Sequence, residues 1–252
     1  MNHDLLIGHF EQICDDPNAI QRLRRFILDL AVRGKLVEQD TNESKPYDSP
    51  TQTHLPFSIP DNWSQIELGK CFSMVNGRAF KSTDWLTTGL PIIRIQNLNN
   101  PNAPFNYCDP AAVEEKHLVN DNEFLISWSG TPGTSFGAFI WKRGPAALNQ
   151  HIFKCSAKTD LFYNEYLKIA INGRLDEMIA KAHGGVGLQH ITKKKLEALA
   201  LPVPPLAEQH RIVSKTRDLM KICDQLEHKI IEAKNLRIHF RESAFARALA
   251  AD

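Results

Sequence analysis

Polar side chains that could read the edges of DNA bases gather in glycine-rich stretches in the middle of the chain. The stretches are residues 76–82, 94–100, 127–135, and a fourth that joins 149–151 with 184–190. They are rich in Arg, Asn, Gln, Ser and Thr, whose donors and acceptors match base edges and phosphates. Glycine also lets a backbone approach a ligand closely. The same composition is typical of ordinary turns, so it favours a nucleic-acid surface without requiring one.

The candidate side chains divide by the group that each would contact. Arg suits guanine and Asn or Gln suits adenine, whereas Lys81 and Lys193 suit phosphates. We expect Arg78, Asn97 and Ser129 to protrude, because such residues lie beside glycines or at strand ends. The candidate DNA-binding residues are Arg78, Lys81, Ser82, Arg94, Gln96, Asn97, Ser129, Thr134, Asn149, Gln150, Gln189, His190 and Lys193.

Motifs that would indicate an enzyme are missing from the sequence. The glycines at 184–187 are not followed by the Gly-Lys-Ser/Thr of a phosphate-binding loop, and Ser129 lacks the flanking glycines of a hydrolase elbow. The histidines and Cys155 lack metal-ligand spacing. No Asn-Pro-Pro-Tyr or Asp-Pro-Pro-Tyr run, of the kind found in adenine methyltransferases, is present. We therefore expect no catalytic residue, no cofactor and no metal, with any catalysis in another subunit.

A long helix is predicted for the last fifth of the chain. Pro204 and Pro205 cannot continue a helix from upstream, so they fix where the next one begins. From Leu206 to Ala250 there is no proline and no glycine, which allows a helix about 65 Å long. Such a length exceeds what a domain of this size needs, and indicates a spacer or an assembly surface.

This predicted helix carries an apolar seam with charged flanks. Apolar residues recur every seven positions, from Ile212 to Phe240, as in a coiled coil. Packing on the chain's own domain is one alternative, but the length favours a partner helix, in the same chain or in a second copy. We expect the seam to be exposed in one chain and buried in an antiparallel homodimer. The candidate assembly residues are Ile212, Leu219, Ile222, Leu226, Ile230 and Leu236.

The chain divides by composition into four parts. Residues 1–37 form an N-terminal helical region, with a helix that Asn18 caps and Gly34 ends. Residues 38–56 are polar and contain three prolines, which indicates a linker. Residues 57–205 contain all four tryptophans and many short strand-like runs. The long helix, 206–252, completes an α/β (α+β) fold.

Residues 57–205 are predicted to form one compact domain built on a bent mixed sheet. Within it, residues 161–182 are spaced as a helix, 183–192 read as a glycine loop and 196–203 as a short strand. The apolar fraction of 42% is ordinary for a globular protein. No apolar run is long enough to span a membrane, and no signal peptide is evident.

Charge and cysteine content limit the functional classes only weakly. The net charge of +1 at pH 7 gives no support for DNA binding by itself, although a basic face is enough, and lysines cluster at 193–195. The five cysteines are odd in number and form no Cys-x-x-Cys pair, which argues against a disulfide framework. A reducing, cytoplasmic location is expected.

Three runs of sequence resemble one known family. They are Leu28–Val37, Ile59–Trp63, and Leu201–Val213 with its Pro-Pro-Leu-x-Glu-Gln-x-Arg-Ile pattern. The chain is similar in these runs to type I restriction–modification specificity subunits, the non-catalytic, DNA-reading parts of methyltransferase and restriction complexes. The resemblance implies that residues 57–205 are a target-recognition domain. It also implies double-stranded DNA, a DNA methyltransferase subunit and a restriction subunit as partners.

The chain departs from the usual pattern of that family. Typical members carry two recognition domains and two long helices, whereas this sequence has one of each, as a half-length subunit or a fragment would. A half-length subunit would read a bipartite site as a homodimer. The alternative is a stand-alone DNA-binding or regulatory module that dimerises through its long helix without a methyltransferase.

Overall fold

A computed structural model describes residues 16, 18–47, 55–130, 136–174, 177, 179, 183–185 and 188–249. The chain divides into two compact units. Unit 1 comprises Met1–Leu28 and Ser214–Asp252, and unit 2 comprises Asp29–Val213. Two helices belong in part to each unit: α2 (Ala19–Val32) and α8 (Leu206–Leu249).

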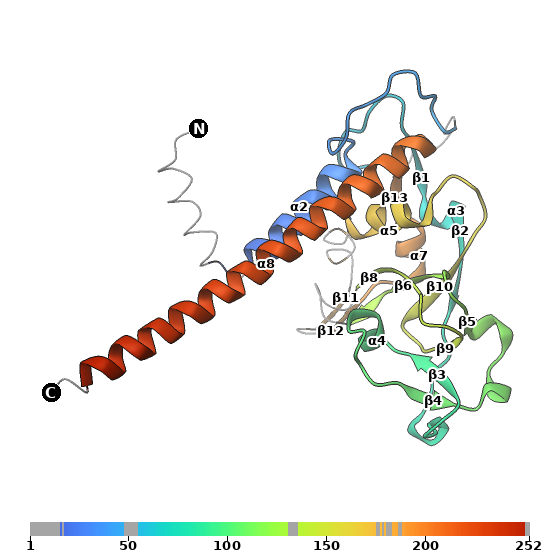
Figure 1. Cartoon of the computed structure of the whole chain (residues 1–252). Helices are drawn as coiled ribbons and strands as arrows, with labels where there is room; N and C mark the ends of the chain where they lie inside the picture. The colour runs from blue at the N-terminus through green and yellow to red at the C-terminus, as the bar shows by residue number, and fades with distance from the viewer. Residues whose placement is uncertain are drawn as a thin grey trace. The chain divides into compact units, whose positions relative to one another are not determined.

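In unit 1, α2 and α8 lie side by side and run in opposite directions (Figure 1). Arg24 of α2 donates to Asp224 at 2.7 Å and to Glu227 at 2.9 Å, both on α8. Ile27 of α2 and Cys223 of α8 are buried. The N-terminal helix therefore packs against a helix of the same chain. Within the described residues, no helix combines the length and apolarity that crossing a bilayer requires.

The seam of α8 is only partly available to a second chain. The expectation that Ile212 faces solvent is wrong: it is 0% exposed, because the first turns of α8 belong to the core of unit 2. Leu219, Leu226 and Ile230 are half-buried, in the stretch that lies beside α2. Ile222 is 49% exposed. Farther along, every residue from 231 to 240 is exposed, including Leu236 at 70%.

The expected α/β fold with a long C-terminal helix is confirmed. Unit 2 contains several small sheets, mostly antiparallel, in place of the one bent mixed sheet that was predicted (Figure 1). One has the order β2-β10-β6-β8 and a second the order β4-β3-β9-β5, where β3 and β9 are parallel. Residues from both sheets, among them Ile93, Leu125 and Leu148, share one buried cluster. The strands of these sheets are β2 (Phe72–Asn76), β3 (Leu90–Ile93), β4 (Asn106–Cys108), β5 (Leu118–Val119), β6 (Phe124–Ser127), β8 (Gly137–Ile140), β9 (Ala146–Leu148) and β10 (Ile152–Ala157).

Two further sheets lie in unit 2. β1 (Ser64–Glu67) pairs with β13 (Ala200–Val203). The hairpin β11 (His183–Gly185) and β12 (Leu188–His190) stands where a glycine loop was predicted, and β12 pairs with β7 (Ser129–Gly130). The helices of unit 2 are α3 (Leu68–Cys71), α4 (Ile95–Asn99), α5 (Asn164–Asn172) and α7 (Lys193–Glu197), with 3-10 turns η1 (Ser82–Asp84), η2 (Pro110–Ala112) and η3 (Glu115–His117).

Helix α7 corrects the strand that was predicted from residue 196. Thr192 caps it, because its side chain accepts a hydrogen bond from the Lys195 N–H. The lysines that follow are good helix formers. β13 therefore begins only at Ala200. α5 ends at Asn172, and residues 177 and 179, which also lie within the predicted helix of 161–182, are helical as well.

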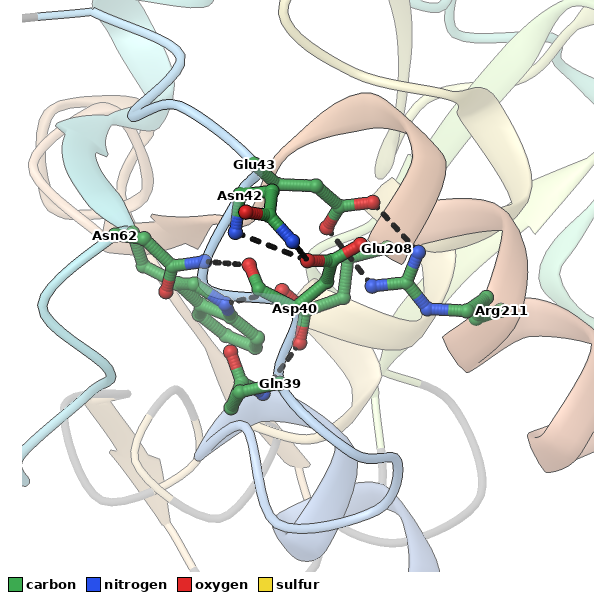
Figure 2. Close-up of polar contacts among 8 residues, drawn as sticks. Gln39, Asp40, Asn42, Glu43, Asn62, Glu208 and Arg211 are labelled. Carbon is green, nitrogen blue, oxygen red and sulfur yellow. Dashed lines mark hydrogen bonds and ion pairs between the residues drawn. The ribbon is translucent and has the colours of Figure 1, made fainter.

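A polar hub holds together three segments of unit 2 that are far apart in the sequence (Figure 2). The hub consists of Gln39, Glu43, Trp63, Glu208 and Arg211. The Glu208 carboxylate is buried and accepts hydrogen bonds from Trp63 Nε1 at 2.8 Å and Gln39 Nε2 at 2.5 Å. Arg211 donates to both oxygens of Glu43, at 2.6 and 2.8 Å. The start of α8 is thereby tied to residues 39–43 and to Trp63.

Residues 38–47, in the segment predicted as a linker, are bound to the domain. Besides the hub contacts, the Ser64 hydroxyl donates to the Tyr47 carbonyl at 2.5 Å. Gly34 lies just before this segment with φ +68°, and a Cβ there would lie 2.4 Å from Pro60 Cγ. Only glycine fits this close approach. The three runs that carry the family resemblance thus meet, through Gly34, Trp63 and Glu208, in one place.

Because of the hub, we expect the stability of the folded chain to depend on pH. Burial raises the pKa of Glu208 above its ordinary value of 4.5, while the hydrogen bonds from Trp63 and Gln39 oppose the shift. A carboxyl group with a raised pKa binds its proton more tightly in the folded state. Its contribution to stability is therefore greatest below pH 4.5 and falls as the pH rises through the pKa of the folded state.

We expect the free energy of unfolding of the wild type, relative to Glu208→Gln, to decrease as the pH is raised from 4.5 to neutral. The glutamine stays uncharged, so it provides a reference that does not titrate. Urea denaturation at several pH values measures the difference, and Glu38→Gln, at an exposed position, controls for the change in net charge. A difference that grows with pH contradicts the prediction.

Candidate nucleic-acid interface

Backbone hydrogen bonds bring the first and fourth polar stretches together. The Arg78 N–H donates to the Leu148 carbonyl at 2.9 Å, and the Gln150 N–H donates to the Arg78 carbonyl at 2.8 Å. A Cβ at Gly77 would lie 2.0 Å from the Asn149 carbonyl oxygen. Glycine is therefore required at position 77, because any side chain would force the two segments apart.

The second stretch joins the same place through β3. The Asn149 N–H donates to the Ile93 carbonyl at 3.1 Å, and the second stretch begins at the next residue, Arg94. The chain then turns into α4, which carries Gln96 and Asn97. Asn149 is thus flanked on one side by Arg78 and on the other by the start of α4.

The third stretch completes the assembly. The Trp128 N–H donates to the His151 carbonyl at 3.1 Å, and Trp128 Nε1 donates to Asn76 Oδ1 at 3.0 Å. β7 pairs with β12, which places Gln189 opposite Gly130. All four stretches therefore converge. We call their described residues, 76–82, 94–100, 127–130, 149–151, 184–185 and 188–190, the polar loop cluster.

The candidate side chains of the polar loop cluster differ in how far they reach solvent. Lys81, Ser82, Gln96 and Gln150 are exposed. Asn149 is half-buried, and its Oδ1 accepts no hydrogen bond from the described residues. These side chains offer donors and acceptors of the kinds that read bases and hold phosphates.

Three candidate cations already have partners inside the molecule. Arg78 donates to the Ala112 carbonyl and lies 3.7 Å from Asp84. The Arg94 guanidinium lies 5.6 Å from the ring centre of Trp85. Lys193 Nζ donates to the Met74 carbonyl at 2.9 Å, with half of its side chain exposed. A ligand could therefore reach only those N–H groups of the three side chains that lie at the solvent-exposed edge.

The expectation that Asn97 and Ser129 protrude is wrong. Asn97 is 3% exposed, and its amide donates to the carbonyls of Ala103 and Pro104, both at 3.2 Å. Its Oδ1 accepts from the Arg94 N–H. Asn97 thus holds the loop after α4 in shape. Ser129 is 7% exposed within β7.

The other candidates are placed only in part. Thr134 lies outside the described residues. Gln189 and His190 belong to β12, of which the backbone pairing is described. Lys193 follows them at the start of α7.

Trp85 and Leu86, in the loop between η1 and β3, are large apolar residues that the candidate list missed. They are 43% and 49% exposed. The signal in the sequence is an apolar pair set between Ser82-Thr83 and Thr87-Thr88, which fits neither a helical nor a strand period. Composition alone does not distinguish such a pair from a buried one.

The chain is similar to several known proteins. Residues 60–234 match the family described as "Type I restriction modification DNA specificity domain". The chain is similar to the type I restriction enzyme EcoAI specificity subunit of Escherichia coli, with 26% identity over 270 residues that cover 93% of this chain and 46% of the relative. It is also similar to the EcoBI specificity subunit of Escherichia coli, at 28% identity over 76% of this chain and 40% of the relative.

A solved structure has a similar fold. The HsdS subunit from Thermoanaerobacter tengcongensis superimposes with a TM-score of 0.55 at 18% identity, covering 92% of this chain and 55% of that one. The chain spans about half the length of the curated relatives it matches. Because the family match extends over most of the chain, this protein belongs to the family of type I restriction modification DNA specificity domains.

Proposed function

We propose that this chain recognises DNA sequence for a type I restriction–modification system. Unit 2 reads one segment of a bipartite site in double-stranded DNA through the polar loop cluster. A partner DNA methyltransferase subunit, and a restriction subunit where one is present, carries out the chemistry. The family of the chain and the specificity subunits among its relatives support the proposal.

The convergence of the four polar stretches is the observation that carries the proposal. Stretches separated by up to about half of the chain are joined by backbone bonds around Asn149, and backbone bonds hold loops more firmly than side chains do. Gln96, Gln150 and Lys81, which belong to these stretches, are exposed. A rigid surface with amide groups at its edge has the composition that base reading requires.

The nearly neutral net charge of the chain is consistent with a DNA interface that is shared with another subunit. Phosphate contacts supply most non-specific affinity for DNA, and a chain of net charge +1 offers few. We infer that the methyltransferase subunit contributes further phosphate contacts, and that the purified chain transfers no methyl group by itself. Incorporation of label from S-adenosylmethionine by the chain alone would overturn this division of roles.

Base reading is expected to depend on the exposed amides of the polar loop cluster. Gln150→Ala or Gln96→Ala should relax the preference at one base pair, because a lost two-point contact costs about 1–3 kcal/mol. Selection from a randomised duplex pool measures the preference. Gln225→Ala, at an exposed glutamine of α8, is the matched control. If both loop variants keep the wild-type consensus, the reading surface lies elsewhere on unit 2.

Loss of a phosphate contact should affect DNA binding differently from loss of a base contact. Lys81→Ala should weaken binding to all sequences alike and lower the salt slope by about one unit, without changing the consensus. Binding titrations at several salt concentrations measure the slope, with the exposed Lys215→Ala on α8 as control. An unchanged slope for Lys81→Ala, or an equal change for Lys215→Ala, removes Lys81 from the interface.

Self-association is expected through the distal part of α8. Leu236 and Phe240 lie four residues apart on one side of α8 and are 70% and 74% exposed. An antiparallel pair of helices would bury this side of each helix and present two reading surfaces. Light scattering at micromolar concentration should show a dimer for the wild type and a monomer for Leu236→Asp. Lys234→Asp, at an exposed polar position of the same stretch, should stay dimeric. A monomeric wild type refutes the prediction.

A further inference from the structure

We propose that Trp85 and Leu86 form an apolar wedge that enters a base step of the bound duplex and distorts it. This inference rests on the proposed function and adds to it a contact that reads the deformability of DNA. In the described part of unit 2, the exposed large apolar side chains are Trp85, Leu86 and Leu206. Two of the three are therefore adjacent in a single loop.

The composition of this loop suits a wedge. Ser82 and Thr83 precede the apolar pair, Thr87 and Thr88 follow it, and all four are exposed. Hydroxyl groups are common donors to phosphate oxygens. An apolar side chain that enters a base step needs contacts of this kind on either side, because the backbone of the DNA must be held while the step opens.

The loop is anchored at both ends. Before the wedge, Asp84 accepts a hydrogen bond from the Lys81 N–H at 2.9 Å and closes η1. At the wedge, the Leu86 N–H donates to the Tyr107 carbonyl at 2.8 Å. After it, a Cβ at Gly89 would lie 2.5 Å from the Cys108 carbonyl oxygen, so the loop is pressed against β4. Trp85 is thus exposed on a fixed backbone, and little ordering is needed when a ligand binds.

The charges around the wedge favour DNA over an apolar protein surface. From Arg78 to Arg94 the chain carries three cationic side chains and one anionic one. The anionic one, Asp84, lies 3.7 Å from Arg78, which offsets its charge. Arg94 lies over the Trp85 ring at 5.6 Å, so a cation accompanies the aromatic face. Cations beside an inserted apolar group are typical of proteins that kink the duplex.

The wedge also adjoins the polar loop cluster. Arg78 and Lys81 belong to that cluster and begin the loop, and Arg94 follows β3 directly beside Asn149. A duplex on the polar loop cluster would therefore have Trp85 within reach. Opening a base step costs an energy that depends on sequence, so the wedge would favour flexible steps at positions where no base edge is contacted.

The test uses the chain of 252 residues and duplexes that carry the sequence selected by the wild type from a randomised pool. 2-Aminopurine replaces adenine at successive positions, and its fluorescence rises where a base loses its stacking partner. The wild type should raise the fluorescence at one step, and Trp85→Phe should retain the signal. Trp85→Ala and Leu86→Ala should lose it and bind about tenfold more weakly. Leu206→Ala, exposed at the start of α8, is the matched control and should behave as the wild type.

Each outcome supports or overturns the wedge. Thermal unfolding checks that the variants fold, and the Trp85→Phe variant separates loss of the ring from loss of the fold. A wild type that selects a consensus but raises no fluorescence overturns the wedge and leaves the proposed function standing. A Trp85→Ala variant that binds DNA normally but fails to capture the methyltransferase subunit assigns the pair to a protein interface and also overturns it. A wild type that binds no DNA overturns both.

Discussion

A buried carboxylate in the first turn of α8 holds unit 2 together. Glu208 is removed from water, and the cost of burying its charge is offset by the hydrogen bonds from Trp63 and Gln39. Its neighbour Gln209 is equally buried: its amide donates to the carbonyls of Leu161 and Pro204, and its Oε1 accepts from the Tyr163 N–H. Two consecutive side chains thus bind distant segments to a helix whose start is fixed by Pro204 and Pro205.

The polar loop cluster depends on a second constraint of the same physical kind. Gly77 lets one backbone segment touch another, and the bonds of Arg78, Asn149 and Trp128 then hold four loops in one place. These hydrogen bonds are made mainly by backbone groups. The amide and lysine side chains at the edge of the polar loop cluster can therefore be replaced by others without loss of the fold. In a recognition surface built in this way, backbone groups position the loops and side chains contact the ligand.

Local signals predicted the bounds of α2 and the start of α8 well. Asn18 and Gly34 mark the two ends of α2, and Pro204 and Pro205 mark the start of α8, each within a residue or so of the observed position. Strand pairing was harder, because β3 pairs in parallel with β9 from more than fifty residues away and no local pattern records such a partner. The single bent sheet was therefore expected where several smaller sheets form.

The sequence identified the loops that lie together better than it predicted how each of their side chains is placed. Glycine-rich polar stretches identified the loops that converge, since turn chemistry is local. The hydrogen-bond partner of each side chain is not a local property of the sequence. The Asn97 amide donates to the carbonyls of Ala103 and Pro104, and Lys193 Nζ donates to the Met74 carbonyl. Trp85 shows the reverse case, in which an exposed aromatic residue, in a loop that is fixed against β4, was missing from the candidate residues.

Recognition of DNA on behalf of a methyltransferase is the central claim, and a map of methylated adenines in the host genome tests it most directly. The map is compared between cells with the gene, cells without it, and cells in which it is restored. We expect a bipartite sequence motif to lose its methylation on deletion and to regain it on restoration. A methylation map that is identical in all three, together with a chain that purifies as a DNA-binding dimer without a methyltransferase, would contradict the claim and favour a stand-alone DNA-binding module.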